Sequence, residues 1–334
     1  MTASDSKVFP HDALVRRIFG APENAAAQFR ATLPAALLAN LDLSTLRVED
    51  SSFVSQELRG TVVDMPYRTE YRGKPAYLYV LFEHMSTVDP LMPLRTLGGA
   101  LQVWERHAQK ARSEGAPLLP LPLVLVQVLH HSERGWTAAT RFEQLFDPEH
   151  LLDEAVRGAV PHWGFLLDDV SLASDDELRQ RQLGPMLTVA LALLRDSRRG
   201  ARLLGTIGAY ANEFEAILKR NGGREAFLVF VLYVWTVTQG TVGQEALEAF
   251  KAVRGAGDAV MTFAEELEAR GEARGEARGK AEGVRLVLLS QLEEKFGPVA
   301  DSVRERISGA GVAECLRWSA RLLQARSASE VLGD

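Results

Sequence analysis

Two acidic residues, Asp64 and Glu83, lie in neighbouring segments whose composition is typical of β-strands. Residues 61–71 and 75–84 are rich in β-branched and aromatic residues, and Gly73-Lys74 between them predicts a two-residue hairpin loop. With that loop, Asp64 pairs directly with Glu83. Carboxylates paired in this way have Cβ atoms roughly 5 Å apart and repel each other, and a divalent cation with oxygen ligands relieves the repulsion. The spacing therefore predicts a metal site between the two acids.

The pairing register decides whether these acids meet. A three-residue loop would shift the pairing by one residue and remove the direct opposition. Pro66 in the first strand predicts an edge strand or a bulge, because proline has no N–H for the ladder. The second strand, Ala76 to Phe82, is almost entirely apolar, which predicts a central strand covered on both faces. A carboxylate at the end of such a strand, Glu83, needs a partner, a metal or a raised pKa.

The surrounding pattern predicts an α/β fold. Residues 11–40 have helical spacing, residues 92–112 predict a long helix, and residues 121–129 predict another buried strand. Because a strand–helix–strand order in one sheet requires a right-handed crossover, the last two strands are expected to be parallel. We expect a mixed β-sheet flanked by helices, followed by a helical region and a small C-terminal helical domain.

The chain is expected to divide into four regions: an α/β core at 8–150, a helical extension at 151–262, a linker or helix at 263–283, and a three-helix domain at 284–334. Ser174 and Glu177 have the spacing of a capping box, which starts a helix running toward Arg195. Residues 224–238 favour a helix, but their many β-branched residues leave a strand open.

Residues 270–283 form a near-repeat of Arg-Gly-Glu-Ala with a period of four. On a helix, the arginines lie on one stripe, and Glu272 and Glu276 lie on a roughly opposite one. Like charges four residues apart and a glycine in every turn, each costing about 1 kcal/mol, weaken an isolated helix. Two interpretations stay open: a solvated flexible linker, or a helix that pairs with a second copy by matching Arg stripe to Glu stripe. The second predicts a homo-oligomer.

Composition limits the classes of function. The 334 residues are 46% hydrophobic and 25% charged with a net charge of −6, so any nucleic-acid binding needs a local basic patch. The single cysteine, Cys315, excludes an intramolecular disulfide and a cysteine-rich zinc site, and we expect it in a core in a reducing cytoplasm. The N-terminal residues predict no signal peptide, and the longest apolar run, 226–237, is too short to span a bilayer. We therefore expect a cytoplasmic protein with no membrane partner.

Other candidate sites are weaker. His11-Asp12 could serve a site, although an aspartate just before a helix is more often an N-cap. His130 and His131 end a predicted strand, where adjacent side chains point to opposite faces, so they are not expected to share a metal. The sequence contains no Walker-type phosphate loop, dinucleotide fingerprint or G-x-S-x-G elbow.

Several segments, in this order and spacing, resemble a known family. They are His11-Asp12, Val63 to Arg68, Phe82 to Ser86, Asp89 with Arg95, and the strand Pro122 to Leu129 followed by Trp136 and Phe142 to Phe146. Together they resemble the Rpn (recombination-promoting nuclease) family, also called the YhgA-like putative transposases, in the PD-(D/E)XK nuclease superfamily. The likeness covers roughly residues 10–240. The tail from about residue 281 is similar to a small C-terminal domain often attached to such proteins.

The resemblance implies a restriction-endonuclease-like core and a Mg²⁺-dependent DNA endonuclease. In that superfamily, an acid on one strand and an acid on the next bind Mg²⁺ and orient a water for phosphodiester hydrolysis. Asp64 and Glu83 match these two positions. Magnesium is usually held by one or two carboxylates together with waters and substrate phosphate, which agrees with such a pair.

The sequence departs from the family pattern at Met85, where the family typically has glutamine. Methionine neither donates a hydrogen bond nor accepts one strongly, so it cannot position a water. Three interpretations follow. Gln127 on the next strand or Gln102 on the following helix substitutes, the enzyme is slow, or the site is inactive and the protein acts in DNA binding or oligomeric assembly.

A fourth interpretation involves no metal at all. In it, Arg68 or Arg95 holds Glu83 in a buried ion pair.

Overall fold

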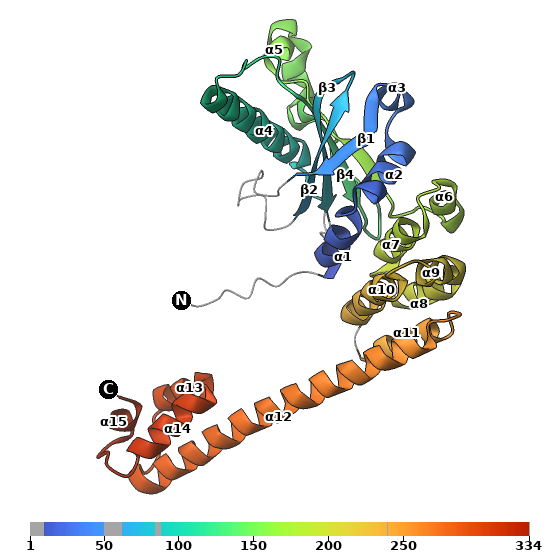
Figure 1. Ribbon diagram of the computed structural model, residues 1–334. Coiled ribbons are helices and arrows are strands. Elements are labelled where there is room, and N and C mark those ends of the chain that lie inside the picture. Colours follow the sequence, from blue (N-terminus) through green and yellow to red (C-terminus); the bar gives the residue numbers. More distant parts are fainter. Residues whose placement is uncertain (1–9, 50–61, 84–87, 239, 334) are drawn as a thin grey trace. The chain divides into compact units, whose positions relative to one another are not determined.

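A computed structural model of the chain (Figure 1) describes residues 10–49, 62–83, 88–238 and 240–333, although not the side chains at 62–64, 79–83 and 274. It separates into two compact units, Met1–Val260 and Met261–Asp334. The finer division into four regions stays a prediction.

The first unit is built on one mixed sheet, which in the described part of the chain has five strands in the order β1-β2-β3-β4-β5. The strands are β1 Leu41–Val48, β2 Val62–Tyr71, β3 Lys74–Glu83, β4 Leu123–His130 and β5 Leu166–Asp169. Neighbours among β1, β2 and β3 are antiparallel, whereas β4 pairs with both β3 and β5 in parallel. The predicted α/β class, mixed sheet and parallel crossover are confirmed.

The hairpin between β2 and β3 turns one residue earlier than predicted. Arg72 and Gly73 form the loop with φ angles of 51° and 71°, and Tyr71 pairs with Lys74. Two positive φ values are typical of a type I′ turn, whose twist matches that of the strands. Asn40 holds Arg72 in this unusual conformation, because the Asn40 carbonyl accepts the Arg72 backbone N–H at 2.8 Å and its side-chain oxygen accepts Arg72 Nε at 3.0 Å.

The expected direct pairing of Asp64 with Glu83 is therefore wrong. Asp64 pairs with Leu81, and Glu83 pairs with Val62. The pairing has moved by two residues, and since side chains in a strand alternate with a period of two, both acids keep the same face of the sheet.

Pro66 does not lie on an edge strand, because β2 runs between β1 and β3. The Pro66 carbonyl accepts the N–H of Glu49, so the missing N–H of Pro66 points toward β1, just where β1 ends at Val48. The pairing of β1 with β2 also shifts between Asp42 and Arg47. The proline thus costs little in ladder hydrogen bonds despite its interior strand.

Helices cover the two faces of the sheet differently (Figure 1). Helices α1 Pro10–Phe19, α2 Pro22–Thr32 and α3 Ala35–Leu38 lie on one side, and α4 Met92–Glu114 lies on the other. On the α1 side, the fully buried Tyr67 donates its hydroxyl to the Phe19 carbonyl at 2.6 Å. On the α4 side, alternate β4 residues and the inner residues of α4 form an apolar cluster that includes Val124, Val126, Val128, Ala100 and Val103.

A helical region follows β4. It comprises two 3₁₀ helices, η3 Phe142–Leu145 and η4 Pro148–Leu152, and the helices α5 Glu154–Ala159, α6 Asp175–Gln180, α7 Pro185–Asp196, α8 Gly200–Ala209, α9 Ala211–Leu218, α10 Gly223–Thr238 and α11 Gly240–Lys251. The predicted capping box of Ser174 and Glu177 is confirmed. The predicted helix from there to Arg195 is interrupted, because Gln182 and Gly184 have positive φ angles. Among the described helices, α10 included, none is long and apolar enough to cross a bilayer.

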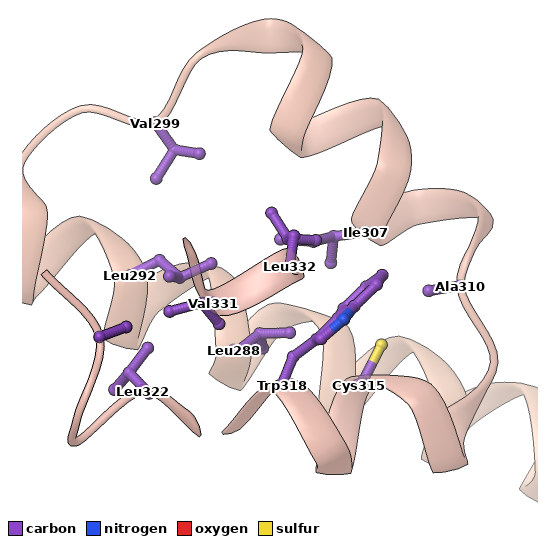
Figure 2. Close-up of a cluster of buried hydrophobic side chains, with 11 residues drawn as sticks. Leu288, Leu292, Val299, Ile307, Ala310, Cys315, Trp318, Leu322, Val331 and Leu332 are labelled. Atoms are coloured by element: carbon purple, nitrogen blue, oxygen red, sulfur yellow. The ribbon is translucent and has the colours of Figure 1, made fainter. Parts of the chain in front are cut away.

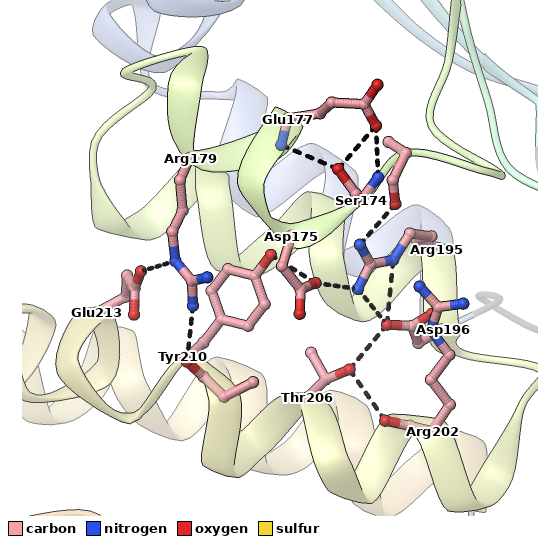
Figure 3. A network of polar contacts seen from close by, with 12 residues as sticks. Ser174, Asp175, Glu177, Arg179, Arg195, Asp196, Arg202, Thr206, Tyr210 and Glu213 are labelled. Carbon is pink, nitrogen blue, oxygen red and sulfur yellow. Dashed lines mark hydrogen bonds and ion pairs between the residues drawn. The ribbon is translucent and has the colours of Figure 1, made fainter.

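A buried charge network joins α6, α7 and α8 (Figure 3). Arg195, whose side chain is 1% exposed, lies 2.5 Å from Asp196 and 2.6 Å from Asp175. Thr206 donates its hydroxyl to Asp196, and Tyr210 donates to Asp175. Burial raises the pKa of Asp175, but the hydrogen bonds from Arg195 and Tyr210 outweigh it, so the net pKa is lowered. The ionised Asp175 carboxylate therefore stabilises the fold fully when the pH is above the ordinary carboxyl pKa. This stabilisation is lost as the pH falls through the lowered pKa that Asp175 has in the folded protein.

The second unit is helical. Its elements are the C-terminal part of α12 Gly257–Phe296, then α13 Asp301–Gly309, α14 Val312–Arg321 and α15 Ala328–Leu332. Residues 270–283 are helical, and the first of the three predicted C-terminal helices is the end of α12. Helix α15 was not predicted. Cys315 and Trp318 belong to a buried apolar core with Leu288 and Ile307 (Figure 2), as expected.

The charge network gives the first prediction. Replacing Arg195 with Met leaves the buried Asp196 carboxylate without its closest charged partner, which costs about 3–5 kcal/mol. Arg202→Met is the matched control, since Arg202 also pairs with Asp196 but is 48% exposed, and it should cost less than about 1 kcal/mol. Urea unfolding of the full chain measures both. Equal losses for the two variants would contradict a buried network centred on Arg195.

Candidate active site on the α4 face of the sheet

The two predicted acids occupy neighbouring positions on one face of the sheet. Asp64 pairs with Leu81, two residues before Glu83, so positions 64 and 83 are diagonal neighbours across the β2–β3 ladder. Diagonal neighbours are about 7–8 Å apart, compared with roughly 5 Å for a direct pair. The side chains of Asp64 and Glu83, and all of Met85, lie outside the described residues.

The face that carries these positions is the one that α4 covers. Tyr77 pairs with Val124 on this face and packs against the apolar cluster under α4. Trp104 of α4 donates its indole N–H to the Pro122 carbonyl at 2.9 Å, and Trp163 donates to Thr96 at the same distance. These contacts fix α4 over the sheet, and strand positions 64 and 83 lie at one end of this apolar layer.

Buried polar groups extend this face at the carboxyl ends of the parallel strands. His130 ends β4 and pairs with Glu83 on one side and Asp169 on the other. Its fully buried ring meets the Trp136 ring edge-on, with centroids 5.0 Å apart. Burial lowers the pKa of His130 more than the Asp169 carboxylate raises it, so the neutral imidazole is favoured.

Asp169 anchors the loops beyond the sheet. Its carboxylate accepts the backbone N–H of Trp136 at 2.6 Å and that of Ser171 at 3.0 Å. Sequence reasoning missed this residue because β5 has only four residues. The available signal was a pair of acids directly after the short apolar run Phe165 to Leu167.

Of the two glutamines proposed to replace Met85, the structure does not bring Gln127 to the acids. Gln127 pairs with Val80, which places it on the opposite face from positions 64 and 83. It is 2% exposed and donates its side-chain amide to Thr32 of α2 at 2.7 Å. Gln102 is half-buried on α4, the helix that covers the acids' face.

Two arginines, Arg68 and Arg95, are proposed to hold Glu83. Arg95 at the start of α4 forms an ion pair with Asp89 at 2.7 Å. Arg68 is exposed on β2, on the same face as Asp64. An ion pair between Glu83 and either of them stays a hypothesis.

His130 and His131 lie on opposite faces of the sheet. His130 contacts Trp136, whereas the ring of His131 lies 5.2 Å from that of His11, on the α1 side of the sheet. The predicted opposite orientation of His130 and His131 is confirmed. His11 also bonds to the Tyr233 hydroxyl at 2.8 Å. Asp12 lies in the first turn of α1, which begins at Pro10, so its predicted role as N-cap is wrong.

Within the described residues, no group of three or more His, Cys, Asp and Glu side chains is arranged to hold a metal ion. The two predicted acids, Asp64 and Glu83, have side chains outside this search. The donor set fits magnesium, which needs only one or two carboxylates because it keeps several waters.

Comparison with known proteins identifies the family. The model of the family described as "Putative transposase, YhgA-like" matches residues 9–222, and the chain belongs to this family. The match includes the whole sheet and α4.

Three curated relatives from Escherichia coli are 28% identical to the chain. Recombination-promoting nuclease RpnD of strain O157:H7 aligns over 201 residues, which are 59% of this chain and 71% of that protein. Recombination-promoting nuclease RpnC of strain K12 aligns over 175 residues, 52% and 54% of the two chains. The inactive recombination-promoting nuclease-like protein RpnE of strain K12 aligns over 188 residues, 56% and 59%. No solved structure matches the chain.

The position of Gln127 gives the second prediction. Gln127→Met should lower the free energy of unfolding by about 1 kcal/mol, because the Thr32 hydroxyl loses its buried donor. It should leave Mg²⁺ affinity unchanged, since Gln127 is on the other face. Urea unfolding and calorimetric titration with MgCl₂ measure the two quantities, with Gln109→Met on the exposed side of α4 as the control. Weaker Mg²⁺ binding at unchanged stability would contradict this placement.

Proposed function

We propose that the chain is a Mg²⁺-dependent DNA endonuclease of the Rpn type, which hydrolyses phosphodiester bonds with Asp64 and Glu83 as the metal ligands. The observation that carries the proposal is the β2–β3 register, in which positions 64 and 83 are diagonal neighbours on one face. The family and the nuclease names of two of the similar proteins support it.

The order of the elements is consistent with a PD-(D/E)XK core. A helix precedes three antiparallel strands, and α4 then crosses to β4, which runs parallel to β3. The proposed ligands lie on the two strands of the central hairpin, β2 and β3, as the resemblance implies.

The chain's own groups would prepare this face for a cation and for a phosphodiester. Asp64 and Glu83 would hold Mg²⁺, which, when bound, acidifies a water and neutralises charge developing on the phosphate. Burial lowers the pKa of His130, which pairs with Glu83, so a positive charge on this imidazole beside the proposed ligands is disfavoured. The neighbouring apolar layer under α4 would lower the local dielectric and so strengthen the attraction between carboxylates and cation.

The alternative is a catalytically inactive nuclease-fold protein that acts in DNA binding or oligomeric assembly. Two observations favour keeping it. Met85 replaces the expected glutamine, and a relative named inactive is as similar to the chain as relatives named nucleases. DNA binding without cleavage distinguishes this alternative from the first proposal.

The third prediction tests the metal ligands. In a plasmid-nicking assay with MgCl₂, Asp64→Asn and Glu83→Gln should each reduce cutting by at least about 100-fold, because each removes a charged oxygen ligand. Glu70→Gln is the matched control, since Glu70 lies on the same strand and face as Asp64 but at the far end of the hairpin. Chelation with EDTA should abolish cutting by the unaltered protein. Equal residual cutting by all three variants rejects the proposed site.

We also propose that α12 assembles with a second copy of the chain. Over residues 268–279 the helix is exposed wherever the structure describes it, and a Cβ added at Gly271, Gly275 or Gly279 would meet nothing within 4 Å. A helix that is polar on all sides and rich in glycine is poorly stable by itself. A partner that covers it would offset this cost.

The charge pattern favours a parallel pair. Going round the helix, the small residues lie between the Arg stripe on one side and the Glu stripe on the other. When two parallel copies meet through a small-residue stripe, the arginines of each copy lie beside the glutamates of the other. An antiparallel pair would place like charges together. Gly and Ala at the contact would let the two helices approach closely.

The fourth prediction follows from this pairing. A variant with Glu in place of Arg270, Arg274 and Arg278 should be a monomer, and so should the variant Glu272→Lys with Glu276→Lys. In either variant, two paired copies would place like charges beside each other. Mixing the two variants should restore a dimer that dissociates at high salt, because the interaction is between exposed charges. Analytical ultracentrifugation measures the mass. A dimer that both variants form alone, or that persists after deletion of 270–283, contradicts the proposed interface.

A further inference from the structure

A pocket of about 550 Å³ lies beyond the carboxyl ends of the parallel strands. Among the described residues, the loop that follows β4, residues 132–137, supplies most of the lining, and Val88 and Arg198 also line the pocket. In open α/β sheets, ligands bind at this edge of the strands. The pocket is close to the proposed acids in the fold, because β4 ends at His130, which pairs with Glu83.

The lining has the chemistry of an anion site. Among the described lining residues, Arg134 and Arg198 bring two guanidinium groups, Ser132 and Thr137 bring two hydroxyls, and Glu133 brings one carboxylate. Guanidinium groups match the geometry of phosphate oxygens and bind them through two parallel N–H donors. Both arginines are exposed, so a long polyanion could reach them from solvent.

The loop that carries Arg134 is held in place by its own hydrogen bonds. Ser132 donates its backbone N–H to Ser171 at 2.8 Å, and Gly135 donates its own to the Ser132 hydroxyl at 2.9 Å. Gly135 has a φ of +83°, and a Cβ there would lie 3.0 Å from the Asp169 carboxylate. A loop that is already ordered loses less entropy when a ligand binds.

Arg134 and Arg198 give the pocket a local concentration of positive charge. The net charge of the whole chain is −6, so a polyanion needs a local basic patch of this kind.

We propose that this pocket binds backbone phosphates of DNA, with Arg134 and Arg198 as the phosphate-binding residues that hold the strand beside Asp64 and Glu83. The identity of the ligand rests on the proposed function. The binding of phosphate does not depend on the metal or on cleavage, so the two can be tested separately.

The fifth prediction uses a fluorescently labelled DNA duplex in EDTA, with affinity measured by anisotropy across a range of salt concentrations. Arg134→Ala with Arg198→Ala should weaken binding about tenfold or more and reduce the slope of log affinity against log salt by about 2, one unit for each phosphate contact. The control, Arg112→Ala with Arg220→Ala, removes the same charge from exposed residues outside the pocket and should change affinity less than twofold. Arg134→Lys with Arg198→Lys should recover the slope and part of the affinity, which also shows that the loop tolerates substitution.

Three results would overturn the proposal: no DNA binding by the unaltered chain, equal weakening in the pocket and control variants, or a mononucleotide that binds as tightly as the duplex. Asp64→Asn and Glu83→Gln separate this proposal from the nuclease. If they cut as the unaltered chain does while the arginine variant loses binding, the phosphate site stands and the metal site fails. If they stop cutting while the arginine variant binds normally, the metal site stands and the phosphate site fails.

Discussion

The pairing of β2 with β3 determines what the sheet can do. A slip of one residue would move Asp64 to the face that carries Tyr67 and Gln127, away from Glu83. Three features oppose such a slip. Tyr67 is fully buried and donates its hydroxyl to the Phe19 carbonyl. The turn at Arg72-Gly73 has two positive φ angles, and Asn40, which lies outside the hairpin, accepts a hydrogen bond from Arg72. The position of the proposed metal ligands thus depends on a tyrosine and a turn that take no part in the chemistry.

The two faces of the sheet differ in how their side chains contact the covering helices. On the α1 side, side-chain hydrogen bonds join α2 to the sheet, from Gln127 to Thr32 and from Gln28 to Asp168. These bonds fix the helices because buried polar groups must find partners. On the α4 side the layer is apolar until its carboxyl edge, where His130, Asp169 and the arginine-lined pocket follow one another. Among the described residues, buried polar groups and the arginines of the pocket gather at that edge, where the proposed acids also lie.

Sequence alone was enough for β2, β3 and β4, the crossover and the shared face of the acids, because alternation and apolar runs have short periods. The short strand β5 was missed. It was not enough for the turn. Gly73 is compatible with more than one position in the loop. The observed turn is fixed by hydrogen bonds from Arg72 to Asn40, which lies 32 residues earlier in the chain. The face of Gln127 required the β3–β4 register, which no local pattern contains. The pocket could not be foreseen either, since Arg198 reaches it from a turn more than 60 residues after the β4 loop.

The proposal that Asp64 and Glu83 bind one divalent cation is tested most directly by a crystal structure of the unaltered protein soaked in MnCl₂. Anomalous scattering would locate the ion. Manganese accepts the same oxygen ligands as magnesium. The account predicts one anomalous peak on the α4 face of the sheet, within coordination distance of carboxylate oxygens of both Asp64 and Glu83. It would be contradicted if no peak appeared there and Glu83 instead formed an ion pair with Arg68 or Arg95.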